Sequence, residues 1–524
     1  MALESTNLTI NTPRVIALRG VFLLLILIVT WFAMTRLPLF DEDEGEYAEV
    51  AVEMAKSHDY ITPTLNGTPF YEKPILAFWL EAPLVEVFGT QPWVFRLPSE
   101  LACLIWLWLI MTFAKEYLNT DTGRLAQLFC ASSLGVVVSA QAAAMDGVLS
   151  AVIAAGLFDI YRYFKTAGQS YVIRVYLWMA LGFLAKGPIA VAIPLIASAV
   201  FFAMEKKWAL WFRAIFYVPA WIVFLLITLP WYVMQYHLMG QAFIDYFLLR
   251  ENLGRLVGGL QGHTGHWWYY LPVLLFIALP HTALLFHGVW QGFVNRKKDP
   301  VLRFLLIWFA TVFVVFSIAQ TKLPHYLLIG LTPLFLLMAL YHGSLKARWW
   351  WIVLGIEWIV MAILPNRLAI MHSEGHSVYV SALLSRITEV IAQGYYSHLL
   401  LMVITTLLLA GLLRYQLKVT MAETTRLSVM FGSHLLLLYL LLPAVANLQE
   451  QPVIDLARYA KKLNEGVVAD NRMPSFAVLL GQPTQNRHAK PGELVFLRVD
   501  QLMDYPHHQI LQQEGGLVLL RVDR

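Results

Sequence analysis

Stretches of apolar residues long enough to cross a lipid bilayer recur along most of this 524-residue chain, and no other feature restricts its fold as strongly. A membrane-spanning helix needs about 20 predominantly apolar residues. Hydrophobic residues make up 59% of the chain and charged residues 14%, and the mean hydropathy is +0.61. Soluble domains average roughly 45–50% apolar and 25% charged residues. The sequence therefore predicts a polytopic α-helical membrane protein.

The apolar pattern predicts about 13 transmembrane helices. Their predicted bounds are 15–35, 98–114, 125–141, 147–164, 172–186, 188–204, 214–236, 268–290, 301–319, 323–342, 349–365, 396–413 and 427–446. The first stretch ends without a small-residue cleavage site, so we expect it to be retained as a membrane helix. The two cysteines, Cys103 and Cys130, lie inside apolar stretches and are expected to be packing residues.

The distribution of Lys and Arg predicts the orientation of the chain. With a cytoplasmic N-terminus, the inside loops hold more basic residues than the outside loops, which is the bias that sets membrane topology. After an odd number of spans the C-terminus is then external. This orientation also brings the unusual polar motifs of the chain to the external face.

The predicted organisation is a transmembrane domain, residues 1–450, followed by a small external α/β domain, residues 451–524. Two long external loops, 36–97 and 237–267, interrupt the first domain. The second loop is polar and contains several glycines, which favours a mobile loop. In the tail, 453–463 has a helical pattern, whereas 476–480, 494–497 and 517–521 are apolar runs that predict strands.

An acidic run, Asp41-Glu42-Asp43-Glu44-Gly45-Glu46, follows directly on the first apolar stretch. Carboxylates near the hydrocarbon boundary are costly and often functional. Asp43 and Glu44 are therefore candidates for a general base or a metal site. The alternatives are a solvated loop and a helix start, because Asp and Glu favour the first turn of a helix.

Further polar residues fall on the same predicted face. Lys73, in Tyr71-Glu72-Lys73-Pro74, and Arg255 suit a phosphate group, although a snorkelling lysine and a surface arginine are the simpler interpretations. Asp146 opens the fourth predicted helix and is either a site residue or a helix cap. Lys322 and Tyr326, in Thr321-Lys322-Leu323-Pro324-His325-Tyr326, either meet the substrate or mark a proline turn at the membrane edge.

Several common motifs are missing from the chain. It contains no Walker loop, no dinucleotide-binding glycine pattern, no HExxH and no GxSxG. The sequence thus offers no support for a nucleotide cofactor or a cytosolic nucleotide-sugar donor. We expect no nucleic-acid partner.

The motifs resemble those of bacterial GT-C glycosyltransferases, most closely the 4-amino-4-deoxy-L-arabinose lipid A transferases and the related protein O-mannosyltransferase-like proteins. The resemblance rests on Asp43-Glu44-x-x-Tyr47-Ala48-Glu49, Tyr60-Ile61-Thr62-Pro63-x-Leu65-Asn66-Gly67-x-Pro69, Glu72-Lys73-Pro74, Phe95-Arg96-Leu97-Pro98-Ser99, Asp146, Ala185-Lys186-Gly187-Pro188 and Thr321-Lys322-Leu323-Pro324-His325-Tyr326-Leu327-Leu328. It covers about residues 15–340 by motif.

The resemblance implies an inverting pentosyl- or hexosyltransferase that takes a sugar from a polyprenyl (undecaprenyl) phosphate donor. The acceptor would be lipid A, lipopolysaccharide or another envelope glycan, at the periplasmic face of the bacterial inner membrane, and the protein would act as a monomer. The implied catalytic residues are Asp43, Asp146 and Glu44. The donor phosphate would be held by Lys73, Arg255 and Lys322, the cavity would be lined by Lys186, Tyr326 and Tyr47, and Glu72 is a possible ligand for a divalent metal.

One position departs from the family pattern. The arabinose transferases usually have Asp-Glu-x-Arg-Tyr, and here Glu46 stands in place of the arginine. The sugar and the acceptor therefore stay open, and a protein or another glycan is an alternative acceptor. A transporter or flippase of lipid-linked sugars is the competing function, but it predicts ionisable groups near the bilayer midplane, whereas here they gather on one face. An accessory subunit would leave these external acidic and basic residues unexplained.

Overall fold

The computed structural model describes residues 13–140, 142–254, 258, 265–371, 378–469, 471 and 473–523. Within these ranges, eight helices are long and apolar enough to cross a membrane, or nine if a bent helix pair counts as one span. Every predicted apolar stretch overlaps helical backbone, but some of these helices are too short or too polar to count as spans. The structure thus supports a multi-spanning helical fold, and the number of about 13 spans stays a prediction.

The helices of the first half surround a buried central helix, α6, which packs against α4, α7 and α8. Nearly all of its residues are buried, because small side chains such as Ala154, Ala155 and Gly156 let the neighbours approach closely. The bounds in this half are α1 Pro13–Met34, α4 Pro92–Tyr117, α5 Thr120–Ser132, η1 Val136–Ala140, α6 Asp146–Thr166, α7 Gln169–Lys186, α8 Ile189–Met204, α9 Trp208–Ile215 and α10 Val218–Met239.

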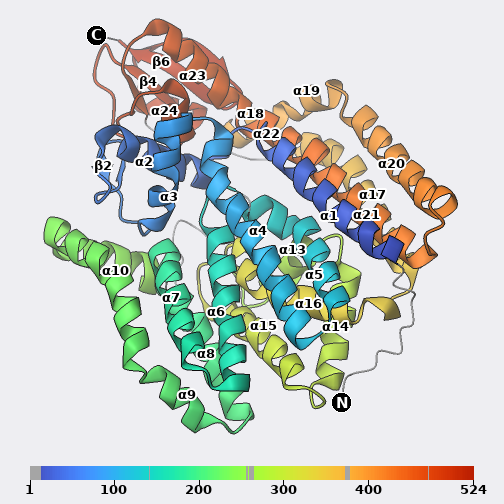
Figure 1. Cartoon of the computed structure of the whole chain (residues 1–524). Coiled ribbons are helices and arrows are strands. Elements are labelled where there is room, and N and C mark those ends of the chain that lie inside the picture. The colour runs from blue at the N-terminus through green and yellow to red at the C-terminus, as the bar shows by residue number, and fades with distance from the viewer. Residues whose placement is uncertain are drawn as a thin grey trace.

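The second half continues the bundle (Figure 1). Helices α13 and α14 are bent by 113° at a short break. The bounds are α11 Gln241–Phe243, η2 Ile244–Leu253, α13 Tyr270–Ile277, α14 Thr282–Asn295, α15 Pro300–Ile318, η3 Pro324–Gly330, α16 Leu331–Leu340, η4 His342–Ser344, α17 Ala347–Met371, α18 Val378–Ser385, α19 Ile387–Ala392, α20 Tyr395–Gly411, η5 Leu412–Gln416, α21 Met421–Leu436, η6 Leu437–Leu441 and α22 Leu442–Gln449.

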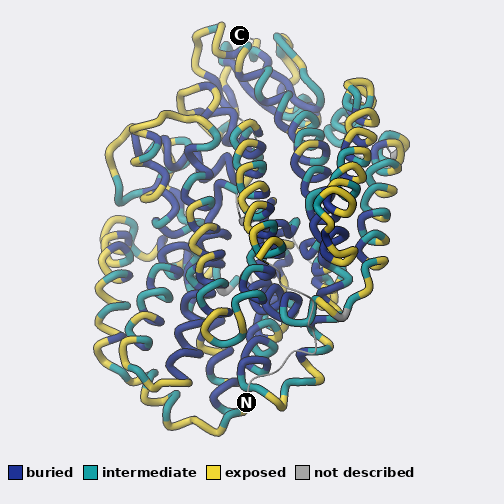
Figure 2. Tube along the Cα trace, turned by 45° about the vertical axis from the view of Figure 1, so that its right-hand side comes forward, coloured by how far each residue is buried: buried dark blue, intermediate teal, exposed yellow. Residues whose placement is uncertain are grey.

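Exposed residues gather on the outer helices, whereas the inner helices are buried (Figure 2), and many of the exposed residues are large and apolar. On α10, for example, Ile222, Leu225, Leu226 and Leu229 are all exposed. A soluble protein rarely exposes so continuous an apolar surface, so this one faces lipid. Cys103 and Cys130 are buried and free, as expected for packing residues.

Two helices and a short hairpin precede α4 at one end of the bundle. They are α2 Asp43–Ser57, β1 Thr64–Leu65, β2 Thr68–Pro69 and α3 Leu76–Phe88. Part of the second long loop is helical, because residues 241–253 form α11 and η2, mostly with wide π-type turns, and the predicted mobility of the loop stays a prediction. Phe243 and Phe247 stack on each other and pack against Trp231 and Tyr232 of α10, which holds this segment against the bundle.

The C-terminal residues form a four-stranded sheet in the order β3-β4-β6-β5, with β3 parallel to β4 and the other pairs antiparallel. The bounds are α23 Gln451–Leu463, β3 Val467–Ala469, α24 Ser475–Leu480, β4 Leu494–Arg498, η7 Val499–Asp504, β5 His508–Glu514 and β6 Leu517–Val522. The predicted helix at 453–463 corresponds to α23, and the predicted strands at 494–497 and 517–521 correspond to β4 and β6, so these three predictions are confirmed. The strand predicted at 476–480 is wrong, because these residues form the helix α24, which packs against α2 and α23.

Candidate active site

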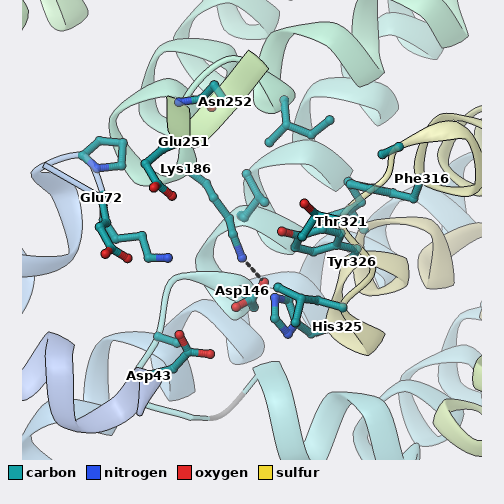
Figure 3. A pocket seen from close by; sticks show the side chains of 18 of the residues that line it. Asp43, Glu72, Asp146, Lys186, Glu251, Asn252, Phe316, Thr321, His325 and Tyr326 are labelled. Atoms are coloured by element: carbon teal, nitrogen blue, oxygen red, sulfur yellow. Dashed lines mark hydrogen bonds and ion pairs between the residues drawn. The ribbon is translucent and has the colours of Figure 1, made fainter. Parts of the chain in front are cut away.

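A cavity of about 690 Å³ lies where α2, the start of α6, the end of α7, η2 and η3 meet. The side chains that line it come from segments far apart in sequence and point into one hollow (Figure 3). Six carboxylates and two lysines are among them: Glu42, Asp43, Glu46, Glu72, Asp146, Glu251, Lys73 and Lys186. Acidic side chains thus outnumber the lysines in the part of the lining that the structure describes.

Asp43 is the first residue of α2, and its exposed side chain faces the cavity (Figure 3). Acidic residues stabilise the first turn of a helix through its dipole, and Asp43, Glu44 and Glu46 all lie there. Helix formation alone thus explains part of the acidic run. The carboxylate of Asp43 nevertheless has access to a bound molecule.

Glu44 has a different environment and does not line the cavity. Its carboxylate forms a bidentate ion pair with Arg96, at 2.8 Å to Nε and 2.5 Å to Nη2. The same two oxygens accept backbone N–H groups of Phe40 and Ala143 at 2.8 and 2.7 Å. Arg96 in turn donates to the carbonyls that end α1. Both oxygens of Glu44 are thus engaged in holding α1, α2 and α4 together.

Asp146 and Lys186 form an ion pair inside the cavity, with 2.6 Å between Oδ1 and Nζ. Asp146 begins α6, and Lys186 ends α7. The chain then turns at Gly187, whose φ of +80° favours glycine. A side chain there would also meet Asn252 and Phe247 of η2 at 3.2 and 3.3 Å. The glycine therefore lets η2 pack closely against the turn that follows Lys186.

Lys73 and Glu72 reach the cavity from the loop before α3. Pro74 also lines the cavity and is buried. Glu72 lies on the side of the cavity opposite His325 and Tyr326 (Figure 3), and its neighbour Lys73 is, with Lys186, one of two lysines among the described lining residues. Lys73 and Lys186 are thus both available to a phosphate bound in the cavity.

The segment after α15 forms the wall beyond the Asp146–Lys186 pair (Figure 3). His325 lies beside Asp146, and the Tyr326 ring centroid is 5.8 Å from Nζ of Lys186. Thr321 and Leu323 line the cavity, but Lys322 between them does not. Its ammonium donates to the carbonyls of Phe316 and Ser317 at 2.8 and 2.6 Å. Lys322 thus caps the C-terminal end of α15 instead of pointing at the cavity.

Tyr47 lines the cavity one turn after Asp43. Burial, and next the charges of Asp146 and Asp43, raise the pKa of its phenol well above the ordinary value. The phenol therefore stays protonated and can donate a hydrogen bond to a ligand, but cannot act as a base at neutral pH.

The sequence prediction missed part of this lining. Glu251, Asn252 and His325 were not among the predicted site residues, although Asn252 lies close to Arg255 and His325 stands between Lys322 and Tyr326. Arg255 lies outside the described residues. Among the residues that the structure describes, no three His, Cys, Asp or Glu side chains converge in a way that could hold a metal ion, so a metal-binding role of Glu72 stays a prediction.

Known proteins resemble the chain in sequence. The family described as dolichyl-phosphate-mannose-protein mannosyltransferase matches residues 72–234. The undecaprenyl phosphate-alpha-4-amino-4-deoxy-L-arabinose arabinosyl transferase 2 of Proteus mirabilis is 30% identical over 331 residues, which are 62% of this chain and 59% of that protein. The corresponding transferase of Serratia proteamaculans is 30% identical over 58% of this chain and 55% of its own length. The matched region thus spans less than two thirds of these relatives.

Solved structures resemble the whole chain. ArnT from Cupriavidus metallidurans bound to undecaprenyl phosphate superimposes with a TM-score of 0.80 over 96% of this chain and 98% of that one, at 19% identity. The Archaeoglobus fulgidus oligosaccharyltransferase gives a TM-score of 0.50 at 10% identity, over 92% of this chain and 70% of that one. The predicted resemblance to the GT-C arabinose transferases is confirmed, and the helical GT-C membrane fold is shared with ArnT.

Proposed function

We propose that this protein is an integral membrane glycosyltransferase that moves a sugar from a polyprenyl phosphate donor to lipid A or another envelope acceptor. The observation that carries the proposal is the cavity itself, in which Asp43, the Asp146–Lys186 pair and Lys73 lie together. The names of the sequence relatives support an arabinosyl transfer from undecaprenyl phosphate. The superimposed ArnT structure holds undecaprenyl phosphate, which supports a site for a polyprenyl phosphate in this fold.

The proposed reaction is an inverting displacement. The acceptor oxygen attacks the anomeric carbon, the bond from that carbon to the phosphate oxygen breaks, and polyprenyl phosphate leaves. Lys73 and Lys186 stabilise the charge that grows on the leaving phosphate, since fixed cations in a site shielded from water act strongly on such charge. A hydroxyl acceptor gives its proton to Asp43, whereas an ionised phosphate on lipid A needs no base.

The acidic lining supports an amino sugar as the transferred group. Among the described residues that line the cavity, six carboxylates outnumber two lysines, which is an excess of negative charge. A phosphate-bearing donor enters such a cavity more easily when its sugar carries an ammonium group, because opposite charges near a dry site attract. Glu46, which lines the cavity, contributes to this excess.

Roles follow for the remaining predicted residues. Tyr47 and Tyr326 contact the sugar. Asp146 holds Lys186 in place through their ion pair and remains a proposed catalytic residue. Glu44 positions the start of α2 through Arg96, and Lys322 supports the wall of the cavity. Arg255 stays a proposed phosphate ligand. Residues 1–450 form the transmembrane catalytic domain, and 451–524 form a periplasmic domain of the inner-membrane protein, which acts as a monomer.

A reconstituted system tests the proposal. Purified protein in vesicles is supplied with undecaprenyl phosphate-linked 4-amino-4-deoxy-L-arabinose and lipid A, and the products are followed by mass spectrometry. We expect transfer by the wild type and none by Asp43→Asn. Lys73→Ala is expected to raise the KM for the donor. Normal turnover by Asp43→Asn, or transport of the donor without transfer, would refute the proposal.

A protein acceptor is the second candidate. It is favoured by the match of residues 72–234 to the protein mannosyltransferase family. Comparing lipid A and envelope proteins from cells with and without this protein separates the two acceptors. A mass increase on lipid A alone supports lipid A as the acceptor, whereas glycosylated peptides support a protein acceptor.

A further inference from the structure

We propose that the C-terminal domain positions Asp43 for the transfer reaction through a contact between Ser475 and Asp41. The inference rests on the proposed function of Asp43. It assigns to Ser475 and Asp41 the role of positioning residues, and it gives the small domain a part in catalysis although none of its described residues lines the cavity.

The contact joins the acidic run to the start of α24. One carboxylate oxygen of Asp41 accepts the backbone N–H of Ser475 at 3.0 Å, and the other accepts its hydroxyl. The backbone N–H of Asp41 donates to Glu450, the residue that follows α22, at 3.2 Å. Ser475 is buried. In Figure 1, α24 lies directly against α2.

Gly45 makes this approach possible. A Cβ atom at position 45 would lie 2.7 Å from the backbone nitrogen of Ser475 and would overlap the Asp41 carboxylate. Real Cβ atoms do not come this close to a backbone nitrogen, and Gly is the residue used where two backbones approach closely. The glycine in the middle of the acidic run is therefore explained by the docking of α24.

The far end of α2 rests on the same domain. Lys56 donates to the carbonyl of Gly481, which follows α24, at 3.0 Å. The hydroxyl of Thr484 donates to Asn66, in the turn of the β1–β2 hairpin, at 3.0 Å. Helix α2 is thus held by the C-terminal domain along its length, and by Arg96 on the side of the bundle.

Asp43 lies between these two supports. Asp41 is anchored to Ser475 two residues before it, and Glu44 is anchored to Arg96 one residue after it. The side chain of Asp43 is itself exposed to the cavity, so its position depends on the backbone at either side. Displacing a catalytic group by about 1 Å can cost roughly 100-fold in rate.

The first test removes, one at a time, two hydroxyl groups that the C-terminal domain donates to the segment around α2. Ser475→Ala removes the hydroxyl bonded to Asp41, and Thr484→Ala removes the hydroxyl bonded to Asn66 in the β1–β2 hairpin. We expect Ser475→Ala to lower kcat by roughly 10- to 100-fold with the KM for the undecaprenyl phosphate-linked donor unchanged. Thr484→Ala is expected to keep wild-type kcat. Equal kcat values for both variants would overturn the inference.

The second test separates geometry from charge at Asp41. Burial raises the pKa of Asp41, so a neutral side chain is tolerated there. Asparagine can accept the N–H of Ser475 and donate to its hydroxyl, so Asp41→Asn is expected to rescue most of the activity that Asp41→Ala loses. Asp43→Asn, two residues away, is expected to be inactive. An inactive Asp41→Asn in folded protein would contradict the positioning role.

Hydrogen exchange measures the positioning without any assay of transfer. Amide exchange over residues 43–50 is expected to quicken in Ser475→Ala and to stay at the wild-type rate in Thr484→Ala. Unchanged exchange in both would refute the inference even if the transferase proposal holds. Faster exchange in Ser475→Ala, with a wild type that shows no transfer, would instead refute only the proposed function.

Discussion

Two neighbouring carboxylates on α2 show how different the surroundings of adjacent residues can be. Successive residues of a helix point about 100° apart, since 3.6 residues make one turn. Asp43 therefore faces the cavity, while Glu44 faces Arg96. The sequence grouped both as catalytic candidates, because the arginine that distinguishes them lies 52 residues further on. The local sequence identifies the acidic run, but only the packed structure shows which of its carboxylates faces the cavity and which pairs with Arg96.

The Glu44–Arg96 pair is expected to be a main support of the fold. Glu44→Ala leaves the buried guanidinium of Arg96 without its carboxylate, and breaking a buried pair in this way costs about 3–5 kcal/mol. We expect a clear drop in the melting temperature of the detergent-solubilised protein. Asp43→Ala, at the exposed neighbour, serves as the control and is expected to cost only about 0.3–1 kcal/mol, because it removes one charge from the first turn of α2. A Glu44→Ala protein as stable as that control would disprove the assignment.

Glu49 gives the protein a pH-dependent stability. Burial, and then the charge of Glu53, raise the pKa of this carboxyl to about 8, and one of its oxygens has no hydrogen-bond partner among the described residues. The folded state thus keeps a proton that the unfolded state loses above about pH 4.5. Stability is expected to fall as the pH rises from about 4.5 to about 8.

The variant Glu49→Gln tests this dependence, since an amide cannot ionise. Relative to the wild type it is expected to gain on the order of 4 kcal/mol at pH 8 and less than about 1 kcal/mol at pH 5. The measurement is the melting temperature of both proteins across this range. The exposed Asp504→Asn is the matched control, and a gain for Glu49→Gln that does not depend on pH would contradict the explanation.

At the scale of elements, the sequence predicts where a regular element lies better than it predicts whether that element is a helix or a strand. The apolar run 476–480 was assigned to a strand because five apolar residues cannot distinguish a strand from a short buried helix. The helix forms because Pro474 precedes it, Gly481 ends it in a left-handed conformation, and α2 and α23 cover it. The sequence predicts a mobile loop at 237–267, but within it η2 is helical and Phe247 packs on Tyr232 of α10.

The turn between α7 and α8 is an element whose glycine is expected to matter. Gly187→Ala forces a side chain into a backbone conformation that costs about 1–3 kcal/mol and pushes it against Asn252 and Phe247. Because Lys186 immediately precedes this turn, we expect transfer activity to fall more than tenfold. Gly355→Ala, in α17 with open space around it, should be neutral in both stability and activity. Equal stability and equal transfer activity of the two variants would show that the glycine turn at position 187 is not required for the reaction.

At the scale of the whole molecule, helix α6 relates the cavity to the opposite end of the bundle. It begins at Asp146 in the cavity and ends at Thr166 beside α9, where Tyr163 donates to the carbonyl of Leu210. A helix of 21 residues is about 32 Å long, close to the thickness of the hydrocarbon layer. The cavity and α9 therefore lie near opposite surfaces of the membrane. The convergence of polar motifs was predictable from charge bias, whereas the number of full spans was not, since several buried helices are short.

The two surfaces can be assigned by labelling single cysteines, because the natural Cys103 and Cys130 are buried and free. Met503, in the C-terminal domain, is 92% exposed, and Lys206, just before α9, is exposed as well. If the C-terminal domain is periplasmic, a membrane-impermeant maleimide should label Met503→Cys in spheroplasts, whereas Lys206→Cys should react only after the membrane is opened. The wild type controls for background labelling. The reverse pattern would invert the proposed orientation, and it would place the cavity with Asp43 on the cytoplasmic side, out of reach of a periplasmic acceptor.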